Sequence, residues 1–383
     1  MNTTAITIKK WGLRVVVTLT VLAVLTAITY GILMRPLMFE RHYLSQASEL
    51  LDVRAQAERN NIFIGASTDD LSSLTSSHFT HSFNSTTPTN LLKLGHLLDD
   101  ADTLHYDFSA ADTFVNQAIN GHHRVRGHTL VWGRLSDTYQ SPNLQRWLDQ
   151  FSTTEQQKEK LQNLLDNHLV QVLTQFKGRI HQWDVVNEPL KLLGNGEFED
   201  DVFYRYFGEH YIEWAFNRAH ELDPSLKLFI NEQLHNYTSK KAQAFYTLVA
   251  RLVKQGVPIH GVGLQHHMLF FLESPEATRA YLAKFATLGI KVEITELDAR
   301  LRLFKNENDP YKAQGEYYRD IVGACLDVSA CSGVTFWGVN DKDSWHDELG
   351  YMFAKPNEPY LFDENNIAKP GVALLYDLLN QQL

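Results

Sequence analysis

Short apolar runs alternate with helical patterns along the chain from about residue 56 onward. The runs are typical of buried parallel strands, because a strand covered on both faces is apolar at nearly every position. They cover residues 61–66, 125–132, 227–231, 261–265, 292–295 and 334–337. Two strands are expected to end on a glutamate. One is a further segment at 181–188, and the other, at 291–296, contains the run 292–295. The pattern therefore predicts repeated strands joined by helices.

The clearest helical pattern covers residues 155–177. Its apolar residues keep the spacing of one helix face, a Ser or Thr at 152–154 can cap its start, and Gly178 follows its end. The chain contains no GxGxxG or GxxxxGK[ST] phosphate loop. A closed (β/α)8 TIM barrel is therefore favoured over a nucleotide-binding open sheet, with an active site at the C-terminal ends of the strands.

The N-terminal region has a different pattern. Residues 15–34 carry no charge and have the length of a membrane-spanning helix. We expect a short basic tail (1–14), a transmembrane signal anchor (15–34), a juxtamembrane segment (35–55) and the barrel (56–383). Basic residues in the tail favour a cytoplasmic N-terminus, which places the catalytic domain outside the cytoplasm, in the periplasm or the extracellular space. A cleaved signal peptide and a secreted body are the alternative.

Composition narrows the possible partners. The formal net charge of −10 argues against nucleic acid, whose phosphates call for a basic surface. A neutral sugar polymer is a better match, and part of the 7 Trp, 16 Tyr and 21 Phe could stack on sugar rings. Cys325 and Cys331 are the only cysteines, and they could close a small disulfide loop in an exported protein or remain two buried thiols.

Histidines cluster at 122–123, 128 and 266–267, which raises the question of a metal site. Adjacent histidines on a strand point to opposite faces, and no HExxH motif occurs. We expect no catalytic metal and no cofactor.

The two strand-terminal glutamates, Glu188 and Glu296, suggest glycoside hydrolysis. That reaction needs one carboxyl group to protonate the leaving oxygen and a second to attack the anomeric carbon or to activate water. The structural alternative for each residue is an ion pair at the rim of a barrel.

Five motifs along the chain, in order, resemble glycoside hydrolase family 10, which consists chiefly of endo-β-1,4-xylanases. They are Arg126-Gly127-His128-Thr129-Leu130-Val131-Trp132, Trp183-Asp184-Val185-Val186-Asn187-Glu188, Gly261-Val262-Gly263-Leu264-Gln265-His266-His267, Ile294-Thr295-Glu296-Leu297-Asp298 and Trp337-Gly338-Val339-Asn340-Asp341-Lys342-Asp343-Ser344-Trp345. The resemblance runs from about Ile62 to Pro370.

The resemblance implies roles for individual residues. Glu188 matches the general acid/base and Glu296 the nucleophile of a retaining, double-displacement mechanism, in which the carboxyl groups are about 5–5.5 Å apart. The negative charge of Glu296 would favour the protonated form of Glu188, and that charge disappears when Glu296 is esterified. Asp298 would orient His267 against the nucleophile. The implied substrate-binding residues are Asn90, Lys93, His128, Trp132, Asn187, Gln265, His267, Trp337 and Trp345.

The chain departs from the family pattern around the expected cleft. Where the family has Glu-Asn-x-Met-Lys-Trp, this chain has Thr89-Asn90-Leu91-Leu92-Lys93-Leu94. Gly133-Arg134-Leu135 replaces His-x-Gln, and Asn231-Glu232-Gln233-Leu234 replaces Asn-Asp-Tyr-Asn. Each lost hydrogen bond to a sugar would cost about 0.5–1.5 kcal/mol, which weakens binding without removing the chemistry.

The expected function is hydrolysis of xylan or xylo-oligosaccharides with retention of configuration. A retaining glycosidase for a different or substituted glycan, and a membrane-anchored glycan-binding protein with weak or no catalysis, are the alternatives. An aldolase-like barrel would need a Schiff-base lysine, for which Lys93 is the only candidate, and it leaves the paired glutamates unexplained.

Overall fold

A computed structural model describes residues 51–133, 144–347 and 357–381. The predicted basic tail, the anchor at 15–34 and most of the juxtamembrane segment lie outside these residues. Within the described ranges, none of the helices combines the length and the apolar character needed to span a membrane.

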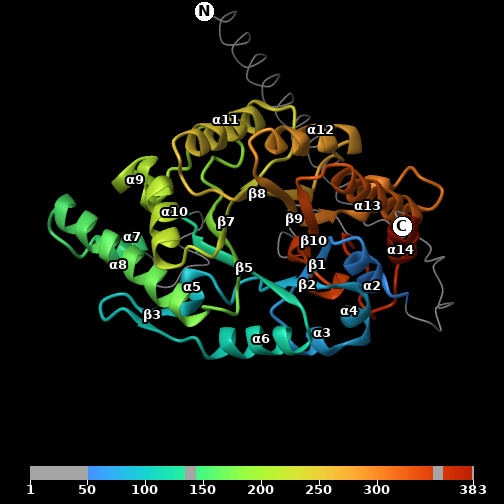
Figure 1. Ribbon diagram of the computed structural model, residues 1–383, viewed down its shortest axis with the longest axis horizontal. Coiled ribbons are helices and arrows are strands. Elements are labelled where there is room, and N and C mark those ends of the chain that lie inside the picture. The colour runs from blue at the N-terminus through green and yellow to red at the C-terminus, as the bar shows by residue number, and fades with distance from the viewer. Residues whose placement is uncertain (1–50, 134–143, 348–356, 382–383) are drawn as a thin grey trace, which may run out of the picture.

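Eight parallel strands close into a barrel and confirm the predicted fold (Figure 1). Around the ring the order is β1, β2, β5, β6, β7, β8, β9, β10 and back to β1. The strands are β1 (Phe63–Ser67), β2 (Ser85–Thr87), β5 (Arg124–Val131), β6 (Gln182–Asn187), β7 (Lys227–Gln233), β8 (Gly261–Met268), β9 (Lys291–Ala299) and β10 (Cys331–Phe336). Because all strands are parallel, their C-terminal ends form one mouth.

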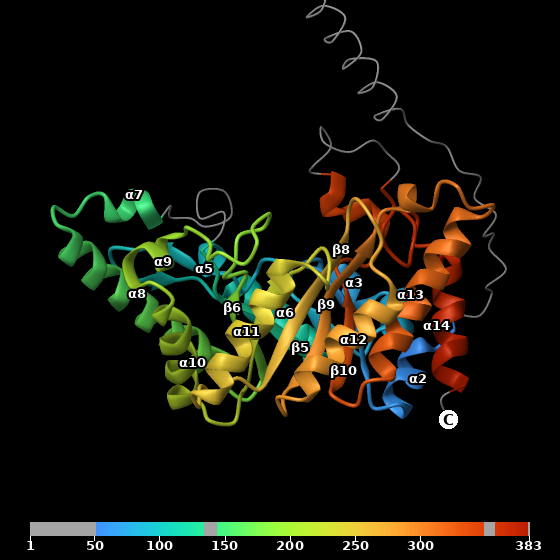
Figure 2. The ribbon, with the colours of Figure 1, turned by 90° about the horizontal axis from the view of Figure 1, so that it is seen from above.

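Helices surround the ring of strands (Figure 2). The longer ones are α6 (Ser109–Asn120), α8 (Thr154–Gln175), α10 (His210–Leu222), α11 (Lys240–Lys254), α12 (Pro275–Ala286), α13 (Pro310–Leu326) and α14 (Pro370–Gln381). The shorter ones are α2 (Val53–Arg59), α3 (Leu71–Thr75), α4 (Ser77–Ser82), α5 (Leu94–Leu97), α7 (Leu144–Leu148) and α9 (Val202–Phe207). The apolar faces of these helices cover the strands and form a continuous core.

Smaller elements complete the loops. A two-stranded antiparallel sheet joins β3 (Leu98–Asp100) to β4 (His105–Tyr106), and 3-10 turns cover Leu301–Phe304, Asp341–Asp343 and Trp345–Asp347. The first of these turns follows β9 and the other two follow β10, so all three belong to the mouth side of the barrel.

Helix α8 shows how closely a local pattern can predict an element. It begins after Thr153, whose hydroxyl accepts a hydrogen bond from the Gln156 backbone while the Gln156 side chain accepts one from the Thr153 backbone. This reciprocal pair satisfies two N–H groups that the helix start leaves open. The predicted range of 155–177 differs from the observed helix by no more than two residues at either end.

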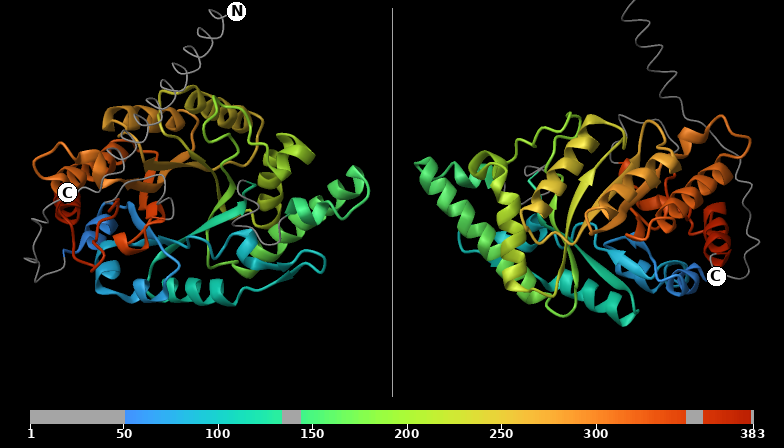
Figure 3. Two further views of the ribbon diagram at one scale, coloured as in Figure 1. Left: turned by 180° about the vertical axis from the view of Figure 1, so that it is seen from behind. Right: turned by 45° about the horizontal axis from the view of Figure 1, so that its top comes forward.

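The first and last described helices pack together and close the outer layer (Figure 3). The Asn60 side-chain amide, at the end of α2, donates to the carbonyl oxygen of Leu379 in α14 at 2.8 Å. Helix α2 begins at Val53, three residues before the predicted start of the barrel at 56. A disulfide joins Cys325 at the end of α13 to Cys331 at the start of β10, with a Cα–Cα distance of 5.4 Å.

Candidate active site

Both strand-terminal glutamates lie at the mouth of the barrel. Glu188 directly follows β6, and its φ of +54° is in the left-handed region that side chains other than glycine rarely adopt. Its backbone N–H donates to the Asn231 carbonyl oxygen at 2.8 Å, which holds this conformation. Glu296 lies in β9 opposite Gln265 of β8. Both glutamates are almost completely buried.

Two donors hold the carboxylate of Glu296. The Asn231 side-chain amide donates to Oε1 at 2.8 Å, and Nε2 of His267 lies 3.0 Å from Oε2. Each carboxylate oxygen therefore has a hydrogen-bond partner. The carboxylate of Glu296 is therefore held in one orientation by residues from two neighbouring strands, β7 and β8.

His267 is held by a second carboxylate. Its Nδ1 lies 2.7 Å from Asp298, which also accepts from the indole N–H of Trp345 at 2.9 Å and pairs with His346 at 3.1 Å. Burial would lower the pKa of His267, but the charges of Asp298 and Glu296 outweigh it and raise that pKa to about 10. His267 is therefore a cation at neutral pH and donates from both ring nitrogens.

The neighbouring histidines lower the pKa of Asp298. Burial would raise its pKa, but the imidazoles of His267 and His346 hold that pKa well below the ordinary range of a carboxyl group. Asp298 therefore stays ionised beside His267, and its contact with Nδ1 is the geometry expected of a residue that orients this ring.

Glu188 is in a different environment. Its Oε2 accepts from the indole N–H of Trp132 at 2.9 Å. The ammonium group of Lys93 lies over the Trp132 ring, 4.7 Å from its centre, and donates to the side-chain oxygen of Asn90 at 2.9 Å. Asn90, Lys93 and Trp132 thus form one connected group beside the acid/base candidate.

Asn231 links the two halves of the site. Besides Glu296, its amide donates to the side-chain oxygen of Asn187 at 2.9 Å, and Gln265 donates to the same oxygen at 3.2 Å. The Thr295 hydroxyl donates to the Asn231 oxygen at 2.7 Å, which fixes the orientation of the amide. The position of Asn231 near the end of β7 was the signal that could have assigned it this role from sequence.

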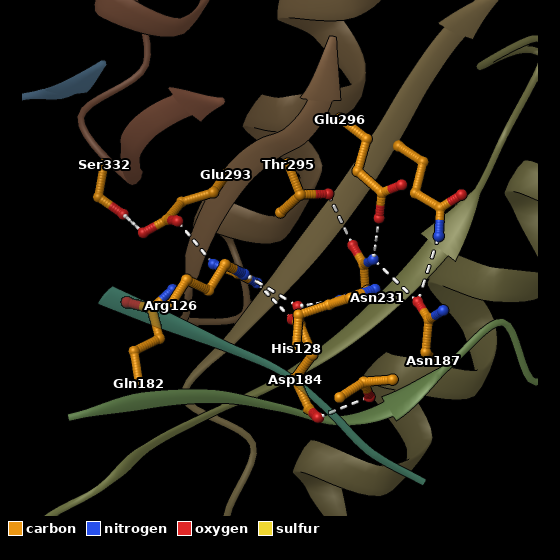
Figure 4. Close-up of polar contacts among 12 residues, drawn as sticks. Arg126, His128, Gln182, Asp184, Asn187, Asn231, Glu293, Thr295, Glu296 and Ser332 are labelled. Atoms are coloured by element: carbon orange, nitrogen blue, oxygen red, sulfur yellow. Dashed lines mark hydrogen bonds and ion pairs between the residues drawn. The ribbon is translucent and has the colours of Figure 1, made fainter. Parts of the chain in front are cut away.

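A buried ionic network lies below the mouth (Figure 4). Nδ1 of His128 lies 3.0 Å from Asp184, and Asp184 pairs with Arg126. Arg126 also pairs with Glu293 at 2.6 Å, and the Ser332 hydroxyl donates to Glu293 at 2.7 Å. Burial would raise the pKa of Asp184, but the adjacent Arg126 holds it below the usual range.

This network is charge-balanced and orients His128. Arg124 adds a second cation, 3.1 Å from Glu293. Two guanidinium groups therefore face two carboxylates, which limits the cost of burying them. Asp184 accepts a hydrogen bond from Nδ1 of His128 and so fixes the ring, which meets Trp337 edge-on with 5.2 Å between the ring centres.

The structure brings together the sugar-binding residues that the resemblance implied. Trp337 lies between His128 and His267, and Trp345 packs edge-on against His267. Among the described residues, no group of three His, Cys, Asp or Glu side chains is arranged to hold a metal ion. His266 differs from His267, because its ring is buried between the hydroxyls of Tyr237 and Tyr317, and burial lowers its pKa to about 3.

The departures from the family pattern have distinct surroundings. Leu94 is buried, and the hydroxyl of Thr89 donates to Ser67 at 3.3 Å. A side chain at Gly133 would collide with the carboxylate of Asp201, the residue that caps helix α9. Residues 134 and 135 lie outside the described ranges.

The Asn231–Leu234 departure was expected at the cleft, but Glu232 is fully buried behind it. Its carboxylate accepts from the Leu190 backbone at 2.9 Å and from Lys241 of α11 at 2.9 Å. Glu232 therefore holds the loop that follows the acid/base candidate, while the expectation that this residue faces the substrate is wrong.

Comparison with known proteins identifies the family. A model of glycosyl hydrolase family 10 matches residues 52–377. The chain belongs to glycosyl hydrolase family 10. It is 33% identical over 350 residues to endo-1,4-beta-xylanase B of Thermotoga neapolitana, covering 88% of this chain and 94% of that protein. It is 34% identical over 303 residues to a beta-1,4-xylanase of Dictyoglomus thermophilum, covering 75% and 79%.

Solved structures of the family share the fold. Xylanase 10B of Thermotoga petrophila, determined with xylobiose, superposes with a TM-score of 0.75 at 32% identity, over 87% of this chain and 98% of that one. The xylanase TsXylA of Thermoanaerobacterium saccharolyticum, determined as a point mutant with xylotetraose, superposes with a TM-score of 0.71 at 29% identity, over 85% and 98%. These relatives bind xylo-oligosaccharides.

Proposed function

We propose that this family 10 glycoside hydrolase is an endo-β-1,4-xylanase that retains the anomeric configuration. The observation that carries the proposal is the contrast between the two glutamates at one mouth. Glu296 accepts from the Asn231 amide and from His267, one on each carboxylate oxygen, while Glu188 accepts from the indole N–H of Trp132. Such a difference in surroundings is what separates a nucleophile from a proton donor.

The first step forms a covalent intermediate. Glu188 gives its proton to the glycosidic oxygen, and the bond between that oxygen and the anomeric carbon breaks. A carboxylate oxygen of Glu296 bonds to the same carbon from the opposite face and forms a glycosyl ester. His267 and Asn231 keep the attacking carboxylate in place, so little reorganisation is needed at the transition state.

The second step releases the sugar. Ester formation removes the negative charge of Glu296, so the ionised Glu188 is no longer disfavoured by a nearby anion. Glu188 takes a proton from water, the water oxygen bonds to the anomeric carbon, and Glu296 leaves as a carboxylate. Two inversions at one carbon give net retention.

Asn187 and Gln265 support the sugar during both steps. Gln265 donates to Asn187, and Asn231 joins them to the nucleophile. This arrangement lets polar groups meet a hydroxyl of the reacting sugar, where hydrogen bonds strengthen as the oxocarbenium-like transition state forms. Trp132, Trp337 and Trp345 supply apolar walls around it.

The departures from the family pattern at Thr89 and Leu94 favour one alternative, a retaining glycosidase for a different or substituted glycan. Thr89 and Leu94 replace a carboxylate and an indole of the family pattern, whereas Asn90 and Lys93 remain. A substituted sugar chain would meet smaller side chains at these two positions than the family pattern provides.

The test is to compare soluble xylan, arabinose-substituted xylan, cellulose and mannan as substrates of the body from residue 51 onward. The proposal predicts xylo-oligosaccharides of mixed length from xylan as the main products. Preferred cleavage of the substituted xylan would select the alternative specificity, and cleavage of cellulose or mannan in preference to both xylans would overturn the assignment.

A further inference from the structure

An exposed apolar tip projects from the loop after β8. It consists of Phe270, Phe271 and Leu272, which are 66%, 48% and 36% exposed. We call these three residues the β8 tip. Water disfavours such contiguous apolar groups, so their exposure calls for a functional explanation.

The β8 tip belongs to the mouth of the barrel. Strand β8 carries Gln265 and His267 of the active site and ends at Met268. Phe271 is four residues after His267, so their Cα atoms are at most about 15 Å apart. The tip therefore lies within reach of a polymer bound over the two glutamates.

The strand order places the β8 tip across the barrel mouth from Asn90 and Lys93. Asn90 and Lys93 follow β2, and β8 is the fourth strand from β2 in either direction around the ring of eight. Figure 1 shows β2 and β8 on opposite sides of the ring. A glycan that enters the mouth at Asn90 and Lys93 would pass over the two glutamates. It would then leave the mouth above the β8 tip.

Both ends of the loop are fixed by buried hydrogen bonds. Arg300 donates to the Leu269 carbonyl oxygen at 3.2 Å on one side. On the other side, the buried carboxylate of Glu273 accepts from the Tyr237 backbone at 2.6 Å and from the Ser274 backbone at 3.0 Å. The tip is thus held out by its anchors, and a pre-formed surface loses less entropy when it binds a ligand.

The chemistry of the β8 tip selects the occupant. Residues 268–272 carry no charge, and the chain has a net charge of −10, which disfavours an anionic lipid surface as the occupant. Flat aromatic rings on a neutral surface suit the C–H faces of pyranose rings. We propose that the β8 tip, with Phe271 at its centre, is a stacking platform for the acceptor part of a neutral β-linked glycan. This proposal rests on the proposed glycanase function.

The test compares two substrates in Phe271 variants. Xylopentaose places sugar rings beyond the cleaved bond, where the β8 tip is proposed to bind them. An aryl β-xylobioside places only an aryl group there. Phe271→Ala should lower kcat/KM for xylopentaose roughly threefold to tenfold and leave the aryl substrate unchanged. Phe271→Tyr keeps the ring and should retain wild-type kinetics, while Phe271→Leu keeps an apolar side chain without a flat face and should resemble Phe271→Ala.

A binding measurement separates this proposal from the proposed function. Xylohexaose affinity is measured by calorimetry in a Glu188→Gln background with and without Phe271→Ala. Weaker binding with Phe271→Ala supports the platform, even if the wild-type protein hydrolyses no xylan. Unchanged affinity and unchanged xylopentaose kinetics in a protein that hydrolyses xylan overturn the platform alone. Unchanged kinetics combined with lost binding to phosphatidylserine vesicles would overturn it and assign the tip to a membrane.

Discussion

At the residue scale, the two glutamates differ in what surrounds them rather than in their chemistry. Glu296 has a donor on each oxygen, and one of these donors is a cation. Glu188 accepts from an indole and lies on a backbone that is held in the left-handed region. We propose that the fold assigns two tasks to the same side-chain type by placing it at two strand ends.

Separate substitutions should distinguish these tasks. Glu188→Ala should lose most activity on xylan, whose leaving group needs a proton, and should regain part of its activity on an activated aryl xyloside when azide is added. Glu296→Ala should be inactive on both substrates, because no covalent ester can form. Steady-state kinetics with and without azide measure both effects. Glu276→Ala, on the exposed surface of α12, is the control.

Recovery of the retained product by Glu296→Ala would remove Glu296 from the mechanism. Equal loss in the Glu276→Ala control would point to a general effect on folding instead of on the chemistry.

The raised pKa of His267 predicts a pH-dependent contribution to stability. The ordinary pKa is 6.5 and the folded value is about 10, so the contribution is complete below pH 6.5 and is lost as the pH rises to 10. His267→Gln should lower the free energy of unfolding by about 1.5–3 kcal/mol at pH 6, and this difference should shrink toward pH 10. Denaturant titrations at several pH values measure it.

The exposed residue His210 on α10 offers a matched control. His210→Gln should show a small difference with no comparable trend. A His267→Gln difference that stays constant from pH 6 to pH 10 would contradict the assigned charge state.

At the scale of the elements, the loop after Glu188 depends on a buried ion pair from two other segments. Glu232 near the end of β7 accepts from the Leu190 backbone and from Lys241 in α11. The carboxylate, the loop and the helix therefore form one unit. A change in α11 is therefore expected to act on the loop that follows Glu188.

Removal of the Lys241 ammonium group should lower the stability of the fold. Lys241→Met removes the buried ammonium group that pairs with the Glu232 carboxylate and should lower the free energy of unfolding by about 3–5 kcal/mol. The double variant Lys241→Met with Glu232→Gln should recover part of that loss. Chemical denaturation measures both, with Lys240→Met, its exposed neighbour, as the control. A loss below about 0.5 kcal/mol in Lys241→Met would show that the pair contributes nothing.

Most strands were predictable from a short apolar run, such as 227–231 in β7, 261–265 in β8 and 292–295 in β9, and these strands are buried at nearly every position. Strand β2 was not, because its three residues, Ser85–Thr87, are polar and too short to show a period. It pairs with β1 and β5 only because the ring must close. Tertiary closure overrides local preference at that position.

The site divides in a similar way. The strand-end positions of Glu188 and Glu296 can be read from local pattern, and the family motifs add the residues around them. The network of Arg126, Asp184 and Glu293 could not be assigned, since charged residues inside apolar strands gain meaning only when the barrel brings β5, β6 and β9 together. The buried position of Glu232 was missed for the same reason.

At the scale of the whole molecule, the barrel accounts for residues 51–381 where it is described, and the apolar segment at 15–34 remains a sequence prediction. We propose that this segment anchors the enzyme to a membrane with the barrel outside the cytoplasm. The full chain should then sediment with membranes after washing at high salt and alkaline pH, while a variant lacking residues 1–34 should stay in the supernatant. A full-length chain released by such washing would contradict the anchor.

The most direct measurement of the central claim follows the anomers released from xylan by proton NMR. Two displacements at the anomeric carbon, by Glu296 and then by water, predict that β-anomers appear first and convert slowly to the equilibrium mixture. Initial release of α-anomers would contradict the assignment of Glu296 as nucleophile and of Glu188 as the residue that serves both steps.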